Sequence, residues 1–286
     1  MTNSININGE LLPLSTPLVM GILNVTPDSF YSGSRKQSGE EIVGRVQQIL
    51  DEGGKIIDIG GQSTSPSAPL LSAGEEFNRV EPALQLIRKE YPDVILSIDT
   101  FYSEVAKHAV EEYGVNIIND ISGGQIDDNM FETVARLNVP YILMHMRGTP
   151  QTMQQFTRYD NFIQDILYYF SEKISKLNLL GVNDIIIDPG FGFSKTTDLN
   201  YRLMAYLKYF DIFDAPILAG ISRKSMIYKL LGCTPQESLN GTSVLNTVAL
   251  LSGASILRVH DVKEAMECVK IVEKISNDLL CLNTLE

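Results

Sequence analysis

Short apolar runs recur along the chain, and each is followed by a polar loop and then by a segment of helical periodicity. Eight such runs are present, at residues 18–23, 56–59, 94–98, 115–118, 141–144, 185–187, 217–219 and 254–259. Their shortness and nearly continuous apolar character are typical of parallel strands that are covered on both faces. We therefore predict eight buried strands.

The segments between these runs predict amphipathic helices. In residues 40–52, apolar side chains such as Ile42, Val46 and Ile49 recur with the helical period, and Gly53 and Gly54 then end the helix. Similar patterns predict helices over residues 75–90, 103–113, 129–137, 161–180, 198–209, 238–251 and 262–280.

Eight strands alternating with eight helices indicate an α/β fold, a single (β/α)8 TIM barrel. An open, doubly wound sheet is the competing architecture. Residues 5–11 alternate around Asn8-Gly9, which predicts a β-hairpin. We expect residues 1–286 to form one domain, in which the N-terminal hairpin (residues 1–17) closes the floor of the barrel.

The composition narrows the possible partners. Among 286 residues there are 23 Lys and Arg against 35 Asp and Glu, which gives a net charge of −12. An acidic surface repels phosphate backbones and anionic lipids, so we expect no nucleic acid and no membrane partner. A site for an anionic substrate must therefore gather the scarce cations locally.

The cysteines and the N-terminus bear on location. Three widely spaced residues, Cys233, Cys268 and Cys281, form neither a disulfide framework nor a zinc pattern. The first residues show no basic segment followed by an apolar stretch, so no signal peptide is evident. We expect a cytoplasmic protein.

Polar side chains follow every predicted strand at its C-terminal end. A single Asn or Asp at such a position is often a turn or cap residue, but recurrence in phase with eight strands favours a shared site. In a barrel these ends converge on one mouth, where such folds hold their active sites. The residues concerned are Asn24, Asp58, Asp99, Asn119, Asp120, His145, Asp188, Ser222, Arg223, Lys224, Arg258 and His260.

The types of these residues suggest what the mouth would bind. The carboxylates of Asp58, Asp99 and Asp188 and the carboxamide of Asn119 can accept hydrogen bonds from adjacent ring N–H and amino groups, which suits a heterocycle with a guanidine-like edge. The basic residues of the mouth would hold an anionic leaving group: Arg223, Lys224, Arg258 and His260.

Seven segments resemble, in order, the signatures of the dihydropteroate synthase family. The resemblance runs from about residue 18 to about residue 275, and seven ordered motifs make it specific. The matching segments are residues 20–30 (MGILNVTPDSF), 57–64 (IDIGGQST), 117–121 (IINDI), 143–146 (LMHM), 188–193 (DPGFGF), 222–226 (SRKSM) and 258–262 (RVHDV).

The resemblance implies a pterin-binding enzyme of folate biosynthesis, a transferase of an alkyl or aryl group. Members of the family join 6-hydroxymethyl-7,8-dihydropterin diphosphate to p-aminobenzoate and release 7,8-dihydropteroate and pyrophosphate, assisted by Mg²⁺. The family is also the target of sulfonamides and commonly forms a homodimer, so a homodimer is expected here.

The same resemblance assigns residues to the pterin. Asp99, Asn119, Asp188 and Lys224 would hold the edge of the ring, and Asp58 would belong to the same substrate-binding set. Met144 and Phe193 would line the pocket, and Arg258 would lie against the ring and also reach the diphosphate. The catalytic residues implied are Asp99, Asp188, Lys224 and Arg258.

Other positions would serve the remaining ligands. Asn24 would contact the metal, and Thr64 and His260 the diphosphate. Phe30 and Pro66 would clasp the p-aminobenzoate ring. Ser225 would meet the carboxylate of p-aminobenzoate, in keeping with the affinity of helix N-termini for anions.

Two loops depart from the family pattern. The family usually has Arg-Pro-Gly after Thr64, whereas this chain has Ser-Pro-Ser at residues 65–67. We expect weaker binding of the diphosphate or of p-aminobenzoate unless Arg35, Lys36 or Arg79 replaces the missing cation. Residues 30–34 (FYSGS) also differ from the usual pattern, and altered sulfonamide sensitivity is a hypothesis that follows.

Two other functions compete with the synthase. A pterin-dependent methyltransferase that delivers methyl to a corrinoid would share the barrel but would not need the anion-binding groups at residues 222–225 and 258–260. A non-catalytic pterin-binding paralogue is favoured only by the missing loop arginine. Pyrophosphate release with both substrates separates the three.

Overall fold

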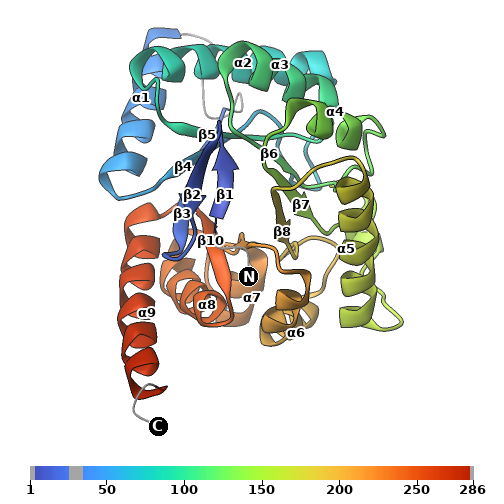
Figure 1. Cartoon of the computed structure of the whole chain (residues 1–286), viewed down its shortest axis with the longest axis vertical. Helices are drawn as coiled ribbons and strands as arrows, with labels where there is room; N and C mark the ends of the chain where they lie inside the picture. Colours follow the sequence, from blue (N-terminus) through green and yellow to red (C-terminus); the bar gives the residue numbers. More distant parts are fainter. Residues whose placement is uncertain (1–3, 26–34, 284–286) are drawn as a thin grey trace.

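The computed structural model describes residues 4–25 and 35–283, and in this part of the chain eight parallel strands close into a barrel (Figure 1). Closure is complete because β10 pairs with β3 on one side and with β9 on the other. The (β/α)8 barrel is thereby confirmed and the open sheet is wrong. The strands are β3 (Leu18–Asn24), β4 (Ile56–Gly60), β5 (Ile95–Asp99), β6 (Ile117–Asp120), β7 (Tyr141–Met144), β8 (Ile185–Asp188), β9 (Ile217–Ala219) and β10 (Ala254–Val259).

Helices surround the barrel on its outside (Figure 1). The α-helices are α1 (Arg35–Asp51), α2 (Ala73–Glu90), α3 (Ser103–Tyr113), α4 (Met130–Leu137), α5 (Phe162–Leu179), α6 (Thr197–Ala205), α7 (Ser225–Leu231), α8 (Leu239–Leu251) and α9 (Val262–Asn283). Short 3-10 helices are η1 (Met153–Gln155), η2 (Leu207–Phe213) and η3 (Gln236–Ser238).

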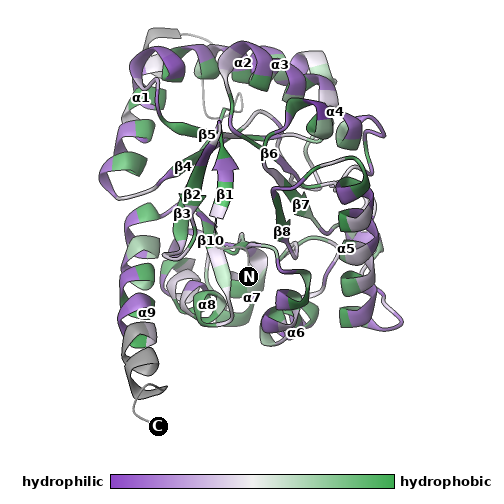
Figure 2. Cartoon of the chain, in the orientation of Figure 1, coloured by the Kyte–Doolittle hydropathy of each residue, from purple (hydrophilic) through white to green (hydrophobic). Residues whose placement is uncertain are grey.

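Alternation along each strand divides its side chains between two apolar clusters. Ile57 and Ile59 of β4 join the cluster between the barrel and the helices, whereas Ile56 joins the cluster inside the barrel. The interior cluster takes one or two residues from most strands and includes Met20, Ile117, Ile142, Ile186, Leu218 and Ile256. In Figure 2 the barrel strands are largely green, because they are buried on both faces. The helices carry both colours, because each buries one face only.

The N-terminal hairpin consists of β1 (Ser4–Ile7) and β2 (Glu10–Pro13). Asn8 and Gly9 have φ of 53° and 90°, the left-handed conformation that a two-residue hairpin turn requires and that Asn-Gly favours. Ile5 and Leu14 pack against the interior cluster. The hairpin therefore covers the N-terminal end of the barrel and leaves the C-terminal end for ligands.

Two predicted helical segments differ from the structure. The segment 198–209 divides into α6 and η2, because the α-helical hydrogen bonds end at Tyr206 and a tighter turn follows. A helix was expected to begin at Ser225, and the structure shows it as the seven-residue α7, whose extent is too short for a period to predict. Gly232 ends it in the left-handed conformation, with φ of 64°.

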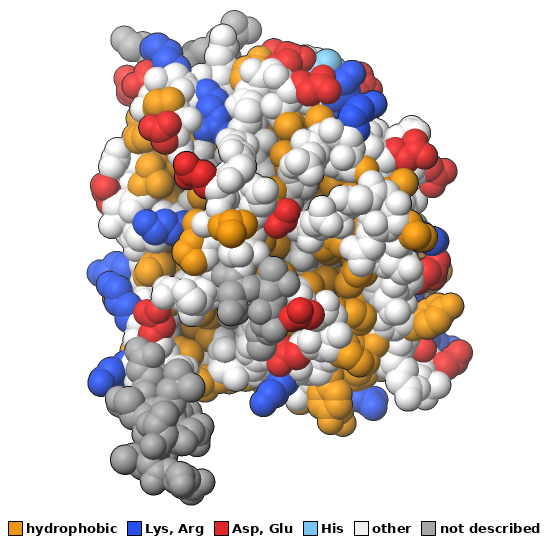
Figure 3. Space-filling view, in the orientation of Figure 1, with side chains coloured by type: hydrophobic (Ala, Val, Ile, Leu, Met, Phe, Trp, Pro, Cys, Tyr) orange, Lys and Arg blue, Asp and Glu red, His pale blue; other side chains and the backbone are white. Residues whose placement is uncertain are grey.

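Among the residues described, none of the helices combines the length and the apolar content that are needed to cross a bilayer. Figure 3 shows acidic and basic side chains interspersed over one face of the molecule.

Candidate active site

The strand alternation that fills the barrel also builds its mouth. Two residues beyond the interior apolar layer, each strand presents its next inward side chain, and in this layer most of them are polar. Asp58 follows Ile56, Asn119 follows Ile117, and Asp188 follows Ile186. The strand register places residues of adjacent strands at the same height in the barrel. Asp99 of β5 pairs with Asn119 of β6, and Met144 of β7 pairs with Asp188 of β8.

Arg258 is the centre of the polar layer. Its Nε donates to Asp58 Oδ2 and its Nη2 donates to Asp99 Oδ2, both at 2.6 Å. Asn119 Nδ2 donates to the same Asp58 oxygen at 3.1 Å. Four of the predicted site residues thus form one network across β4, β5, β6 and β10, in which Asp58 is fully buried and Asp99 is 12% exposed.

The network leaves a hydrogen-bond acceptor free at the mouth. Asp58 Oδ1 is buried and has no hydrogen-bond partner within the described residues. Burial raises the pKa of Asp99 to about 7, an effect that the Arg258 charge opposes and the Asp58 charge reinforces. A ligand that brings N–H donors to these carboxylates would therefore gain strong hydrogen bonds.

Asp188 and Lys224 form the other polar side of the mouth. Gly190 N donates to Asp188 Oδ1 at 2.8 Å, which holds the carboxylate at the start of the loop that follows β8. Lys224 Nζ donates to the carbonyl of Phe191 and lies 4.7 Å from the centre of the Phe193 ring. Burial lowers the pKa of Lys224 to about 8, although Asp188 opposes this.

An apolar wall adjoins these groups. The buried side chains of Met144 and Phe193, both predicted to line the pocket, belong to one cluster with Phe101, Met146 and Met153. The last three were not predicted as pocket residues, because Phe101 and Met146 lie in loops and Met153 begins the three-residue helix η1, where no period identifies the direction of a side chain. A flat ring would find an apolar surface here beside the polar acceptors.

His260 is a hydrogen-bonding group and not a cation. Ser222 Oγ accepts from the His260 backbone N–H at 3.2 Å and lies 3.0 Å from Nδ1. Burial and the charge of Arg258 lower the pKa of His260 to about 4, so the imidazole is neutral at pH 7.

Arg223 is engaged within the fold, which argues against the anion-holding role expected from sequence. Its guanidinium binds both carboxylate oxygens of Asp261, at 2.8 Å and 2.9 Å, and its Nη1 donates to the carbonyls of Pro235 and Gln236. Because these bonds occupy the guanidinium, Arg223 joins the loop after β9 to η3 and to the end of β10.

The loop that follows β4 carries Thr64 and Pro66, of which Pro66 is exposed. Ser65 Oγ lies 3.1 Å from Ser67 Oγ, so the two serines that replace the family's Arg and Gly bond each other. Arg79 of α2 donates from Nη1 to Gly61 O at 3.3 Å and is the cation beside this loop. Phe30 lies outside the described residues.

The side chains of Arg35 and Lys36 also lie outside the described part of the structure. Ser225 is the first residue of α7 and directly follows Lys224.

Asn24 is the candidate metal contact. It ends β3 with an exposed side chain, and its carboxamide oxygen lies beside Gly60 of β4. Within the described residues, no three His, Cys, Asp or Glu side chains gather as a metal cage. Mg²⁺ suits such a place because it retains waters and binds substrate phosphates with few protein ligands.

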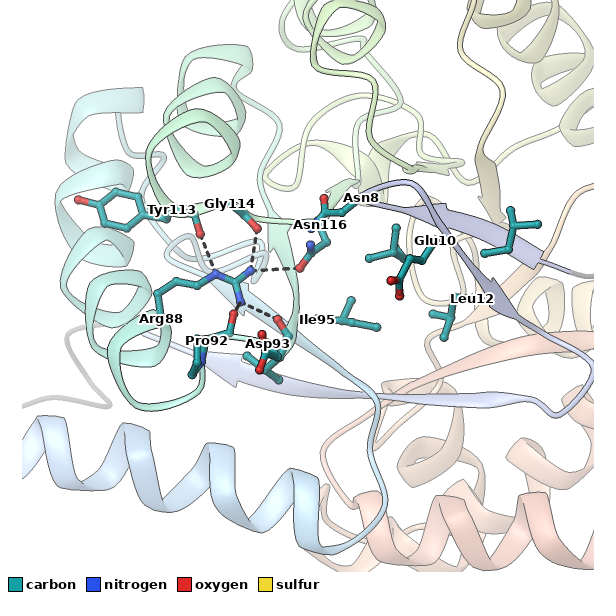
Figure 4. A pocket seen from close by; sticks show the side chains of 13 residues that line it. Asn8, Glu10, Leu12, Arg88, Pro92, Asp93, Ile95, Tyr113, Gly114 and Asn116 are labelled. Carbon is teal, nitrogen blue, oxygen red and sulfur yellow. Dashed lines mark hydrogen bonds between the residues drawn. The ribbon is translucent and has the colours of Figure 1, made fainter.

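A cavity of about 670 Å³ lies at the opposite end of the barrel from the polar layer, between the hairpin, α2 and β5 (Figure 4). Its one arginine is structural. Arg88 uses all five N–H donors on the carbonyls of Tyr113, Pro92, Val94 and Gly114 and on Asn116 Oδ1. With these donors occupied, Arg88 fixes the ends of α2 and α3 to the barrel floor and has none left for a ligand.

Two buried ionisable residues near the mouth were not predicted. Lys195 is 3% exposed and lies beside His145 behind the β8 loop. Glu76 is fully buried at the start of α2, and neither carboxylate oxygen has a partner in the described structure. Burial raises the pKa of Glu76 to about 8. Both occur in helical or loop sequences where charged residues are usually exposed, so no local signal identifies them.

The sequence pattern of the pterin binding enzyme family matches residues 20–260. The chain is 42% identical to the dihydropteroate synthase of Escherichia coli over 267 residues, which cover 93% of this chain and 94% of that protein.

Solved structures agree with this likeness. The chain is similar to the Yersinia pestis dihydropteroate synthase in complex with a sulfonamide drug, with a TM-score of 0.88 and 39% identity over 96% of this chain and 99% of that one. It is also similar to the Xanthomonas albilineans dihydropteroate synthase with 4-aminobenzoic acid, with a TM-score of 0.87 and 34% identity over the same shares.

Proposed function

Because the chain belongs to the dihydropteroate synthase family of pterin-binding enzymes, we propose how its own residues divide the family's reaction among them. The reaction joins 6-hydroxymethyl-7,8-dihydropterin diphosphate to p-aminobenzoate, and 7,8-dihydropteroate and pyrophosphate leave. The observation that carries the proposal is the network in which Arg258 binds Asp58 and Asp99 beside Asn119.

The edge of the pterin ring binds the acceptors of the mouth. Asp188 and Asn119 face the amino and ring N–H groups, with Asp99 and Asp58 completing the polar layer. Met144 and Phe193 contact the faces of the ring, and Lys224 donates to a ring acceptor from its place above Phe193. These contacts fix the exocyclic carbon toward the open side of the mouth.

Charge separates as the bond between that carbon and the diphosphate oxygen stretches. Positive charge builds on the electron-rich pterin, where the carboxylates of Asp99 and Asp188 stabilise it. Negative charge builds on the diphosphate, where Arg258 supplies a cation and Thr64 and neutral His260 supply hydrogen bonds. Preorganised groups of this kind contribute about 3 kcal/mol each.

Asn24 would hold Mg²⁺ together with the diphosphate and water. Its exposed carboxamide offers an oxygen ligand of the kind that Mg²⁺ prefers, at the end of β3. When bound, the metal neutralises charge on the leaving group. Removing Mg²⁺ with a chelator should slow pyrophosphate release by the wild type, whereas an Asn24→Leu variant should respond less to added Mg²⁺.

The p-aminobenzoate would bind between the loops that follow β3 and β4, with Phe30 and Pro66 against its ring and Ser225 near its carboxylate. Its aryl amine is already nucleophilic, so the reaction needs no strong general base. Ser65 and Ser67 leave this site without the family's loop arginine, and Arg79 of α2, which donates to Gly61 O, is the candidate replacement.

A homodimer is part of the proposal, and the outer face of α8 supports it. Val244, Val248 and Leu251, one or two turns apart, are 54%, 38% and 54% exposed. Ile271 on α9 and Leu230 on α7 add 59% and 62% exposed apolar side chains from the helices on either side. A second copy would cover this face. Sedimentation should give a dimer for the wild type and a monomer for Val244→Glu combined with Leu251→Glu.

A cytoplasmic location also belongs to the proposal. Cys233 and Cys268 are free thiols, which a reducing compartment preserves. Cell fractionation of the tagged protein tests this, with the protein expected in the soluble cytoplasmic fraction.

The experiment that tests the function measures pyrophosphate release. Release from the pterin diphosphate should require p-aminobenzoate, and 7,8-dihydropteroate should form in equal amount. A protein that binds the pterin without releasing pyrophosphate would instead be a non-catalytic paralogue. Transfer of a methyl group to a corrinoid would identify the methyltransferase.

A further inference from the structure

Lys195 lies in an unusual setting for a lysine. It follows the DPGFGF segment and is 3% exposed, and its Nζ lies within 3.0 Å of three polar atoms: His145 Nδ1, Gly190 O and Phe193 O. None of these partners carries a negative charge. A lysine held so deeply by neutral acceptors serves geometry more than charge pairing.

The loop of residues 189–194 wraps around this amine. Gly190, Gly192 and Ser194 have φ of 73°, 85° and 51°, so three of its residues are left-handed. A Cβ on Gly190 would lie 2.1 Å from the carbonyl oxygen of His145 and 3.4 Å from Lys195 Nζ. Such a backbone has few conformations available elsewhere and needs bonds that hold it here.

Two lysines supply those bonds. Lys195 Nζ donates to the carbonyls of Gly190 and Phe193, and Lys224 Nζ donates to the carbonyl of Phe191 between them. The loop begins at Asp188, whose carbonyl accepts from His145 N at 3.0 Å. The loop therefore connects the carboxylate at the ring edge to the aromatic ring of the wall.

His145 completes the arrangement from β7. It is 2% exposed, and its ring packs edge-on against Tyr169 at 4.9 Å between centres. Burial and the nearby Lys195 hold the pKa of His145 well below its usual value, so the imidazole is neutral. Its Nδ1 and Lys195 Nζ share one hydrogen bond, which fixes where the amine lies.

We propose that Lys195, oriented by His145, is a positioning residue for the pterin: it sets the loop that places Asp188 and Phe193 and thereby determines affinity for the ring without touching it. This inference rests on the proposed function. It predicts that loss of the Lys195 amine weakens binding of the pterin but not of p-aminobenzoate, because the p-aminobenzoate site is built from other loops.

The test compares substrates and matched variants. Lys195→Met keeps the length of the side chain and removes the amine. We expect the dissociation constant for the pterin diphosphate, measured by calorimetry without p-aminobenzoate, to rise about tenfold, as loss of a buried hydrogen-bond donor implies. The KM for p-aminobenzoate at saturating pterin should stay unchanged. Lys176→Met, on the exposed face of α5, is the control and should match the wild type.

A pair of His145 variants provides a second measurement that leaves Lys195 in place. Asn offers a polar atom near the position of Nδ1, so His145→Asn should retain pterin affinity, whereas His145→Leu should lose about tenfold. This pair decides the matter if Lys195→Met does not fold.

Three results would overturn this inference and leave the proposed function standing. They are equal pterin affinity in Lys195→Met and the wild type, a parallel rise in the KM values of both substrates, and equal pterin affinity in the two His145 variants. A wild type that does not bind the pterin diphosphate would overturn the proposed function with it.

Discussion

Arg258 Nε and Asp58 Oδ2 lie 2.6 Å apart across the mouth of the barrel, although 200 residues separate them in the sequence. Closure of the barrel makes this contact, since β3 lies between β10 and β4. A guanidinium that also binds Asp99 is immobilised before any substrate arrives. Under the proposed function, this one side chain would couple binding of the ring to stabilisation of charge on the leaving group.

Removing this cation should damage both stability and activity. Arg258→Met leaves Asp58 and Asp99 buried without their partner, and we expect the free energy of unfolding to fall by about 3 kcal/mol. Turnover should fall by at least about 100-fold, as expected for loss of a group that stabilises the leaving diphosphate. Urea denaturation and pyrophosphate release measure the two effects. Unchanged stability would show that the ion pairs contribute little.

Protonation of Lys224 should set the alkaline limit of the reaction. Burial lowers its pKa to about 8, so the free enzyme loses the ammonium as pH rises through this value. We expect kcat/KM for the pterin to decline above about pH 8. Lys224→Arg keeps a charge at higher pH and should move the decline upward. If the wild type and Lys224→Arg have the same pH profile, the decline in kcat/KM above about pH 8 comes from another group.

Glu76 should make the fold less stable as pH rises. Its folded pKa of about 8 lies above the ordinary value of 4.5, so folding favours the protonated form. The loss in free energy of unfolding that Glu76 causes is absent below pH 4.5, grows as pH rises from 4.5 to 8, and is complete above pH 8. Glu76→Gln should therefore stabilise the protein by about 4 kcal/mol at pH 8 and leave it unchanged at pH 4. Denaturation of both proteins at these two pH values tests this, and a gain of equal size at both would exclude ionisation as its cause.

Restoring the family's loop cation should strengthen substrate binding. Ser65→Arg adds a positive charge on the loop that carries Thr64 and Pro66, and we expect the KM for the pterin diphosphate or for p-aminobenzoate to fall by a few fold, about 1 kcal/mol. Ser65→Gln adds length without charge and is the matched control. An equal gain in the two variants would show that the added charge is not the cause, and no gain in either would show that the loop does not lack a cation.

The fold and most of the mouth could be predicted from sequence for one physical reason. Parallel strands buried on both faces appear as apolar runs, and the first polar residue after each run marks the same end of the barrel. The positions of Asp58, Asn119 and Asp188 follow directly. Because the motifs are local, they also identify the loops that carry Thr64 and Ser225.

Side-chain direction in loops could not be predicted in this way. Arg223 and Arg258 both follow strands, yet Arg223 has φ of 54° and turns toward Asp261, away from the mouth network. Lys195 follows a residue with φ of 51° and is drawn inward. Such reversals depend on three-dimensional contacts, not on periodicity.

Binding of the pterin diphosphate to Asp188→Asn tests most sharply whether acceptors at the barrel mouth recognise the edge of the ring. The substitution preserves size and one oxygen that can accept from Gly190 N, but replaces an acceptor by a donor. We predict a loss of affinity of about 100-fold by calorimetry in a protein with wild-type thermal stability. Affinity equal to that of the wild type would show that the ring binds elsewhere.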